Sequence, residues 1–142
     1  MNLVNLNLSD NQISVVEGLV TLTKLQNVQL KRNRIGGNGL TDLLGLLECP
    51  TISALDISDN HIETEDIVPE ILVKMTQLAV LYMQNNQFNK KIAHYRKSII
   101  SRLPNLKYID DKPIFEDEKR YAEAWARGGV EEERKERQLY QR

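Results

Sequence analysis

The stretch LVNLNLSDN, residues 3 to 11, carries a pattern that returns three more times along the chain. The pattern is LxxLxLxxN, in which aliphatic residues or methionine occupy the L positions and asparagine the last. The copies begin at Leu3, Leu25, Ile52 and Leu78, with separations of 22, 27 and 26 residues. A degenerate fifth copy begins at Leu106. A period of this length with this consensus is typical of units that bury their apolar sides only by stacking on one another.

The repeat predicts an α/β fold class, namely a leucine-rich repeat solenoid with a parallel concave β-sheet, convex helices and a C-terminal helical cap. The fourth and sixth positions of each copy lie two residues apart, which places both on one face of a strand. An amide at the end of each copy can both donate to and accept from the turning backbone. We therefore expect a buried ladder of asparagines, formed by Asn11, Asn33, Asn60 and Asn86.

The segments that return from one strand to the next differ in length. Apolar residues between Ile13 and Leu22 step by three, which predicts a short 3₁₀ or irregular return. Residues 40–47, 67–75 and 92–103 follow the three-and-four spacing of α-helices. Asn89 is the predicted N-cap of the last of these helices.

A charged tail follows the repeats, so we divide the chain into residues 1–115, the leucine-rich repeats with their cap, and 116–142, a charged helical tail. The tail holds eight acidic and seven basic side chains in 27 positions. Four helical ion pairs are predicted: Glu116–Arg120, Glu123–Arg127, Glu131–Lys135 and Glu133–Arg137. Trp125 is expected either as a buried lid residue or as a partner-binding side chain. Gly128-Gly129 predicts a break, beyond which the helix is expected to project or fray.

The composition of the 142-residue chain indicates one domain. The net charge of −1 gives no indication of binding to nucleic acid or to an anionic membrane. No apolar run approaches the ~18 residues of a membrane-spanning helix, and repeat sequence follows Met1 directly, so we expect a soluble intracellular protein. The only cysteine, Cys49, excludes an intrachain disulfide and favours a reducing compartment, where we expect it to be a small buried hydrophobe.

The sequence contains no recognisable catalytic group, so we expect a non-enzymatic protein with neither cofactor nor metal. His61 and His94 are the only histidines, and neither stands in an HExxH motif. Acidic residues surround His61, but its position at a strand exit favours solvent contact over metal binding. The stretch Gly36 to Gly39 lacks the Lys-Ser/Thr of a phosphate loop, which favours a turn into a helix.

The concave face is the surface that this fold leaves free to bind a partner. Its central row is predicted to be Asn7, Gln29, Asp56, Tyr82 and Asp110. The row one pleat earlier is Asn5, Asn27, Ala54, Val80 and Tyr108, and the row one pleat later is Ser9, Lys31, Ser58, Gln84 and Lys112.

Two interpretations of the concave face remain open. Lys31 and Arg32 can pair with Asp56 and Asp59 of the next strand as a solvated charge lattice. Alternatively, aromatic residues near the C-terminal end anchor a protein-binding patch, because such side chains dominate many interfaces. The predicted protein-binding residues are Gln29, Lys31, Asp56, Val80, Tyr82, Tyr108, Asp110 and Trp125.

Residues 89–111, NKKIAHYRKSIISRLPNLKYIDD, resemble the cap of many intracellular leucine-rich-repeat proteins. The match lies at Tyr95-Arg96 and at residues 103–106. Similar caps close the SDS22-type phosphatase regulator, the U2 small nuclear ribonucleoprotein A-prime subunit and the acidic nuclear phosphoproteins. Asp111 takes the place of the sixth-position leucine, so the apolar stack is expected to end there.

The stretches DDKPIF (residues 110–115), AEAWARGG (122–129) and EEER (131–134) resemble the segment after the cap in the dynein axonemal assembly factor 1 family. That resemblance implies a cytoplasmic scaffold for building outer dynein arms in cilia or flagella, with dynein chains or co-chaperones as partners. An SDS22-like regulatory subunit of a protein phosphatase is the alternative. Binding of a ribonucleoprotein partner is a third hypothesis, for which a basic nuclear-localising run is missing.

The front of the chain departs from that family, which usually carries further repeats and an N-terminal cap. Leu3, Leu6 and Leu8 belong to the first predicted strand, and no earlier unit covers them. An uncovered strand edge invites pairing with another chain. We therefore expect self-association through the N-terminal edge.

Overall fold

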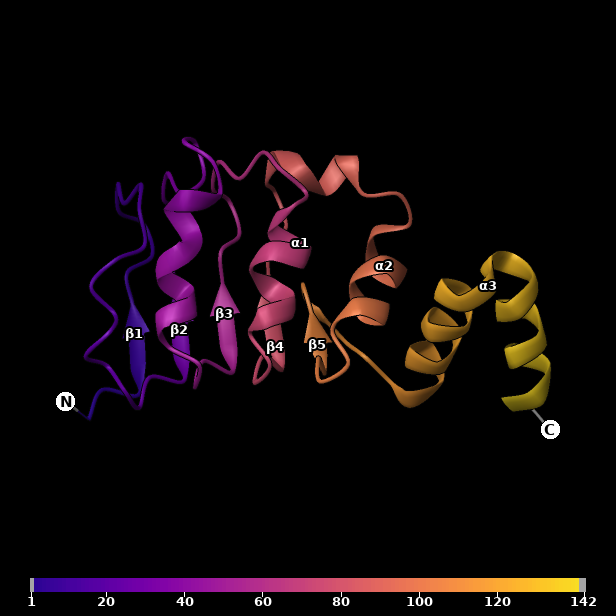
Figure 1. The fold of residues 1–142 in the computed structure, drawn as a ribbon. Helices are drawn as coiled ribbons and strands as arrows, with labels where there is room; N and C mark the ends of the chain where they lie inside the picture. The colour runs from indigo at the N-terminus through magenta and orange to yellow at the C-terminus, as the bar shows by residue number, and fades with distance from the viewer. Residues whose placement is uncertain (1, 141–142) are drawn as a thin grey trace.

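The structure, a computed structural model, describes residues 2–140 as a row of stacked repeats closed by helices at the C-terminal end (Figure 1). The strands are β1 (Asn5–Asn7), β2 (Asn27–Gln29), β3 (Ala54–Asp56), β4 (Val80–Tyr82), β5 (Tyr108–Ile109) and β6 (Lys112–Pro113). The helices are η1 (Leu40–Glu48), α1 (Ile67–Glu70), η2 (Leu72–Lys74), η3 (Gln87–Lys91), α2 (Tyr95–Arg102) and α3 (Glu116–Tyr140), where η denotes a 3₁₀ helix. The predicted leucine-rich repeat fold is confirmed.

The sheet follows the order of the chain, from β1 to β6. Strands β1 to β5 are parallel, and their register aligns Leu6, Val28, Leu55, Leu81 and Ile109. Because equivalent positions lie side by side, the apolar face is continuous. Strand β6 turns back antiparallel and pairs Lys112 with Ile109. The placement of Lys112 in the outer concave row was therefore wrong, since the chain has already reversed direction.

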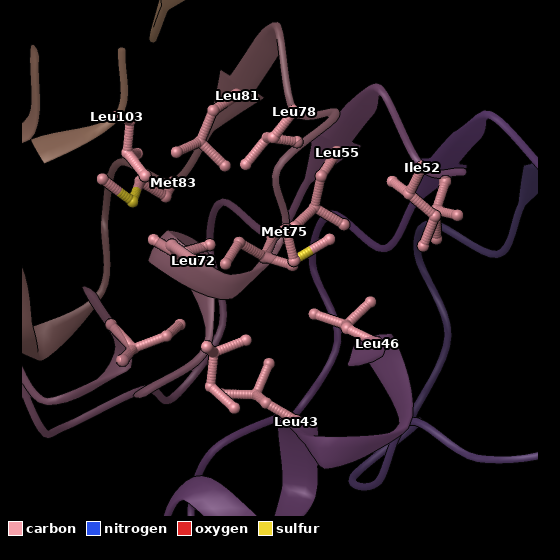
Figure 2. Close-up of a cluster of buried hydrophobic side chains, with 14 of the residues drawn as sticks. Leu43, Leu46, Ile52, Leu55, Leu72, Met75, Leu78, Leu81, Met83 and Leu103 are labelled. Carbon is pink, nitrogen blue, oxygen red and sulfur yellow. The ribbon is translucent and has the colours of Figure 1, made fainter. Parts of the chain in front are cut away.

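The core lies between the sheet and the returning segments. Figure 2 shows Leu55 and Leu81, from two strands, facing Leu46 and Leu72 from the returns. These four side chains are at most 1% exposed. Burying a leucine side chain contributes roughly 1.5–3 kcal/mol. Cys49 is 3% exposed, as expected for a small buried hydrophobe.

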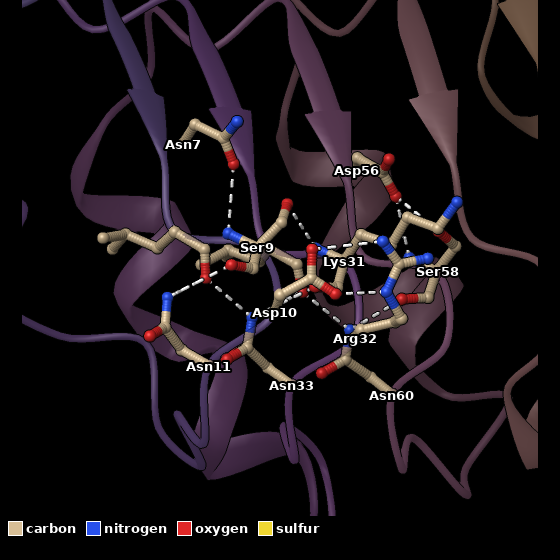
Figure 3. A network of polar contacts seen from close by, with 12 residues as sticks. Asn7, Ser9, Asp10, Asn11, Lys31, Arg32, Asn33, Asp56, Ser58 and Asn60 are labelled. Carbon is tan, nitrogen blue, oxygen red and sulfur yellow. Dashed lines mark hydrogen bonds and ion pairs between the residues drawn. The ribbon is translucent and has the colours of Figure 1, made fainter.

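The asparagine ladder connects each turn to the preceding repeat. Asn33, Asn60 and Asn86 are 5%, 5% and 7% exposed. Asn60 Nδ2 donates to the carbonyls of Leu30 and Ile57, both at 3.0 Å, so one amide joins two repeats. Figure 3 shows Asn60 next to Asn33 of the preceding turn. The prediction fails at Asn11, which is exposed and donates only within its own turn, because no described repeat covers its outer side.

The returning segments are less α-helical than their spacing predicted. The second return is the 3₁₀ helix η1, and α1 spans only four residues before η2 follows. Successive strands lie about 4.8 Å apart, which is much less than the width of an α-helix, so slimmer 3₁₀ turns fit better. Gly45 lies so close to the first return that an added Cβ would meet the Val16 carbonyl oxygen at 2.1 Å.

The fourth return consists of η3 and α2 rather than one helix. Asn89, the predicted N-cap, lies inside η3, where its Oδ1 accepts from the Asn86 backbone N at 2.8 Å. His94, in a left-handed conformation with φ of 50°, precedes α2 instead. Spacing alone missed this interruption because the apolar positions continue in phase across it.

The glycine-rich turn before η1 is closed around a carboxylate. Asp42 is 3% exposed, and its Oδ2 accepts from the backbone N of Gly36 and of Asn38, both at 3.1 Å. Gly36 has φ of +100°, and an added Cβ would lie 2.6 Å from the Ile62 Cα. Glycine therefore allows this turn to pack closely against Ile62. The backbone N–H groups of Gly36 and Asn38, which a bound phosphate would need as donors, already donate to Asp42.

Helix α3 is a helical hairpin. Gly128 and Gly129 have non-helical φ and ψ, which confirms the predicted break. The second half folds back beside the first (Figure 1), and the Arg137 guanidinium lies 4.2 Å from the centre of the Tyr121 ring. Through Tyr140, the prediction of a projecting or fraying helix was therefore wrong. Residues 141–142 lie outside the described part of the chain.

Ion pairs hold this hairpin together and fix it to the cap. Of the predicted helical pairs, Glu133–Arg137 forms at 2.9 Å. Arg120 pairs with Glu136 across the hairpin instead of with Glu116. Glu131 and Glu132 pair over three residues with Arg134 and Lys135, and no partner within residues 2–140 pairs with Glu123.

The division at residue 115 stays a prediction, although the tail packs closely on the repeats. Lys97 and Arg96 of α2 pair with Glu133 and Glu118 of α3, the latter pair at 2.6 Å. Ala122 is 1% exposed and belongs to the same apolar core as the repeats. Within residues 2–140, no helix is long and apolar enough to cross a membrane.

Candidate functional site

The outward-facing side chains of β2, β3 and β4 form a shallow hollow on the concave face. The register places Gln29, Asp56 and Tyr82 in one row, as predicted. The hollow has a volume of about 220 Å³ and is lined by Asn27, Gln29, Ala54, Leu55, Asp56, Val80 and Tyr82. It therefore brings together four predicted residues. The prediction overlooked Ala54 as part of the site, although a small residue between Asn27 and Val80 is the signal for a depression.

Two tyrosines border the C-terminal side of this hollow. The rings of Tyr82 and Tyr108 lie 5.7 Å apart between centroids and are tilted by 48°. Partial burial, and then the adjacent Tyr108 phenol, raises the pKa of Tyr82 above its ordinary value. Both side chains are half-buried, so they offer apolar ring surface together with hydroxyl groups. This combination is typical of interface anchors.

The charged groups of the concave face pair differently from the predicted lattice. Arg32 pairs with Asp10 of the preceding turn, and not with Asp56 or Asp59 (Figure 3). Asp10 and Arg32 occupy the same position in successive repeats, both with positive φ, so their side chains lie next to each other. The hydrogen bond from Arg32 lowers the pKa of Asp10 below its ordinary value.

Asp56 and Lys31 are consequently left for other contacts. Asp56 Oδ1 accepts from the Ser58 backbone N at 3.0 Å and from the Ser58 hydroxyl at 2.6 Å. The Lys31 ammonium forms no ion pair with any carboxylate of residues 2–140. A partner with mixed charge is therefore compatible with this part of the surface.

Asp110 lies at the end of the row but is already engaged within the cap. Its Oδ1 accepts from the Met83 backbone N at 2.9 Å, and its Oδ2 accepts from the Tyr95 hydroxyl at 3.1 Å. Burial raises the pKa of Asp110, although these bonds oppose the shift. The geometry indicates a closing role at the edge of the parallel sheet. Tyr95 was missed as its partner because the two residues lie 15 positions apart.

Trp125 belongs to a different surface from the hollow. It lies on α3, half-buried, with its ring edge-on to His94 at 5.3 Å between centroids. The Lys97 ammonium lies 5.9 Å from the centre of the ring. The expected buried lid residue is thus only half-buried, and a role in partner binding stays a prediction.

No grouping of three or more His, Cys, Asp or Glu side chains within residues 2–140 has the arrangement of a metal site. His61 is exposed, as its position at the strand exit predicted.

The repeats, the sheet and the convex returns define the class of protein to which the chain belongs. A family model described as "Leucine-rich repeat" matches residues 2–137, and the chain belongs to this family.

Particular relatives confirm the resemblance to dynein axonemal assembly factor 1. Leucine-rich repeat-containing protein ODA7 of Chlamydomonas reinhardtii is 38% identical over 95 residues, covering 67% of this chain and 22% of that protein. Human dynein axonemal assembly factor 1 is 39% identical over 100 residues, covering 70% of this chain and 14% of that protein. The homolog of Aedes aegypti is 47% identical over 91 residues, covering 64% and 8%. The chain thus spans less than a quarter of the length of these relatives.

Solved structures agree with the fold. The Drosophila melanogaster SNF/U2A′ complex contains a chain similar to this one, with a TM-score of 0.68 and 24% identity, covering 87% of this chain and 68% of that chain. Internalin C2 of Listeria monocytogenes gives a TM-score of 0.55 at 29% identity, covering 75% and 41%. Because the chain in the SNF/U2A′ complex is only 24% identical, its likeness to this chain shows the fold alone.

Proposed function

We propose that the chain is the repeat-and-cap part of an assembly factor for axonemal dynein. It acts as a non-enzymatic scaffold in the cytoplasm of a ciliated or flagellated cell. The observation that carries the proposal is the 38–47% identity to proteins named as dynein axonemal assembly factors or ODA7, over 91 to 111 residues. Dynein chains or co-chaperones are the proposed partners, with no role for nucleic acid or membrane.

The partner is proposed to bind the C-terminal half of the concave sheet. Tyr82 and Tyr108 supply the anchor, with Val80 as their apolar neighbour in the sheet. Gln29, Asp56 and Lys31 supply polar contacts toward the N-terminal side. A hollow bordered by aromatic rings and surrounded by polar groups has the composition of an interface centre with its rim.

The SDS22-like alternative is not favoured by the relatives, which are named for dynein assembly. It remains distinguishable by experiment, because a phosphatase regulator would capture a phosphatase catalytic subunit instead of dynein chains.

Affinity capture from a flagellated-cell extract, with the immobilised chain as bait and mass spectrometry as readout, tests the function. We expect dynein chains and chaperones to be enriched. Replacing both Tyr82 and Tyr108 by alanine removes the anchor, and we expect capture to fall by about tenfold or more. The urea unfolding midpoint should change little, because both side chains are partly solvated.

The matched control replaces Asn5 and Asn7 by alanine at the other end of the same face. We expect it to leave capture intact. Equal loss in both double variants would place the site elsewhere on the sheet, and recovery of a phosphatase catalytic subunit would favour the alternative function.

A further inference from the structure

A second recess lies on the helical side of the solenoid, beside α2, which stands between α1 and α3 (Figure 1). Its volume is about 590 Å³. None of its lining residues lines the concave hollow. The two surfaces can therefore be occupied independently.

Apolar side chains form part of the lining of this recess. Ile92 and Ala93, just before α2, contribute to it together with Trp125 and Ala126 of α3. Ala93 and Ala126 are exposed, while Ile92 and Trp125 are half-buried. Apolar surface that stays accessible next to a fixed indole ring provides a place for an apolar side chain of a partner.

Two cations flank the recess along α2. Lys91 is the last residue of η3 and lies four residues before α2 begins, whereas Arg102 is the last residue of α2, a helix about 10 Å long. Ser98, Ser101 and Arg102 share one face of the helix at spacings of three and four. Neither Lys91 nor Arg102 pairs with a carboxylate of residues 2–140.

This arrangement contrasts with the other cations of the same helix. Arg96 and Lys97 are both used to fix α3, through Glu118 and Glu133. Glu65 is the one acidic side chain among the lining residues, so the lining carries a net positive charge. Two cations that pair with no carboxylate of residues 2–140, and that line a recess together with apolar side chains, are complementary to a segment with carboxylates on both sides of apolar residues.

We propose that this α2–α3 recess binds a short acidic segment of a partner protein, in which apolar side chains lie between two carboxylates. The apolar side chains pack on Trp125, Ala126 and Ile92. The carboxylates pair with Lys91 and Arg102. The recess is separate from the concave surface. The proposal that Tyr82 and Tyr108 anchor a partner therefore does not depend on whether the recess binds an acidic segment.

Trp125 is the only tryptophan of the chain, so its fluorescence reports on the recess directly. The probes are synthetic peptides of about ten residues in which leucines are flanked by glutamates, and counterparts with lysine in place of glutamate. We expect a saturable change in emission with the acidic peptide alone. In the double variant Lys91→Glu/Arg102→Glu, we expect affinity for the acidic peptide to fall by about tenfold or more and the lysine peptide to bind instead.

The matched control is Lys24→Glu/Lys107→Glu, which reverses two exposed charges outside the recess and should leave binding unchanged. Ala126→Gln, which narrows the recess in a helix-compatible way, should weaken binding in calorimetry while circular dichroism stays as in the parent. An unchanged emission, equal affinity for both peptides, or equal loss in the control would overturn the proposal. So would a response to inorganic phosphate alone, or to protein concentration alone, which would assign the recess to a phosphate group or to a second copy.

Discussion

Each turn of the solenoid depends on two adjacent residues with different roles. The asparagine satisfies backbone groups, while the residue before it takes a left-handed conformation, with φ of 62° at Asp10, 56° at Arg32, 56° at Asp59 and 62° at Asn85. This conformation costs roughly 1–2 kcal/mol for an ordinary side chain such as that of Arg32. The hydrogen bonds of the following asparagine offset that cost.

Asn60 tests this role most cleanly, because both sides of its amide are used. Its Oδ1 accepts from the Ile35 backbone N at 3.1 Å, and its Nδ2 donates to three carbonyls at 3.0 Å each. Replacing Asn60 by alanine leaves these groups unsatisfied, and we expect the free energy of unfolding in urea to fall by about 1–3 kcal/mol. We expect Asn11→Ala, at the exposed end of the ladder, to lower the free energy of unfolding by a smaller amount. Equal free energies of unfolding for the Asn60 variant and the parent would show that the asparagine ladder does not stabilise the fold.

At this scale, the repeat identified which residues are buried from the second copy onward, but it did not identify which charges pair. The asparagine positions followed from the pattern, because hydrogen-bonding capacity belongs to the residue type. The pairing of Arg32 with Asp10 depended on two positive φ angles, and an arginine gives no sign of a left-handed conformation. The bond between Asp110 and Tyr95 depended on where α2 begins, which apolar spacing did not indicate.

Among the elements, the convex returns show the limit of periodicity most clearly. Spacings of three and four occur in both α and 3₁₀ segments over fewer than three turns, so η1 could not be distinguished from an α-helix by its leucines. The width available beside the neighbouring repeat decides between them. Gly45 is the one residue of η1 whose identity reflects that restriction, since Val16 occupies the space of its side chain.

The folded-back tail was partly predictable. Gly128-Gly129 marked the break, and Gly129 has φ of 72° and ψ of −154°, a conformation that is essentially restricted to glycine. The return of the second half could not be read from the helical spacing, because its ties to the first half and to α2 join residues 16 to 36 positions apart. A mostly charged helix becomes packed when its charges find partners on another helix.

Glu133 is the centre of that packing and gives it a pH dependence. Burial acts to raise its pKa, but hydrogen bonds from Lys97 and Arg137 outweigh burial and hold the pKa below the ordinary value of 4.5. A lowered pKa means that the ionised carboxylate stabilises the fold above pH 4.5, and that this contribution is lost as the pH falls through the folded-state value. Glu133→Gln should cost about 1–3 kcal/mol at pH 7, and less below pH 4.5.

Amide hydrogen exchange over residues 130–140 measures the change, because loss of this contact increases local opening. The matched control is Glu131→Gln, whose exposed pair with Arg134 should contribute at most about 0.5 kcal/mol. Equal exchange in the two variants at pH 7 would show that the tail is held mainly by Tyr121 and Ala122.

For the whole molecule, stacking leaves two unlike ends. At the C-terminal end, β6 ends the parallel sheet and α3 covers α2, with Ala122 in the shared core. At the other end, β1 is the edge strand of the sheet, and a recess of about 450 Å³ opens between β1 and the first return. Leu6, Leu8 and Ile13 line this recess and are only partly buried.

Within residues 2–140, no strand pairs with the outer edge of β1, and an apolar end beside such an edge is a favourable surface for another chain. We expect this 142-residue chain to self-associate there, with the edge of β1 pairing between two copies. Sedimentation velocity at increasing concentration should show a rising weight-average mass. Val4→Lys places a charge at the edge, where Val4 is 38% exposed, and should keep the chain monomeric.

Val20→Lys is the control, because Val20 is 62% exposed and does not line the recess. We expect the Val20 variant to associate like the parent, because its side chain is not part of the recess lining. Both variants add one lysine, so any general effect of the added charge on solubility is the same in both. A parent that stays monomeric at high concentration would show that solvent satisfies the edge of β1. A Val20 variant that dissociates as readily as the Val4 variant would mean that general charge repulsion, and not strand pairing, controls the assembly.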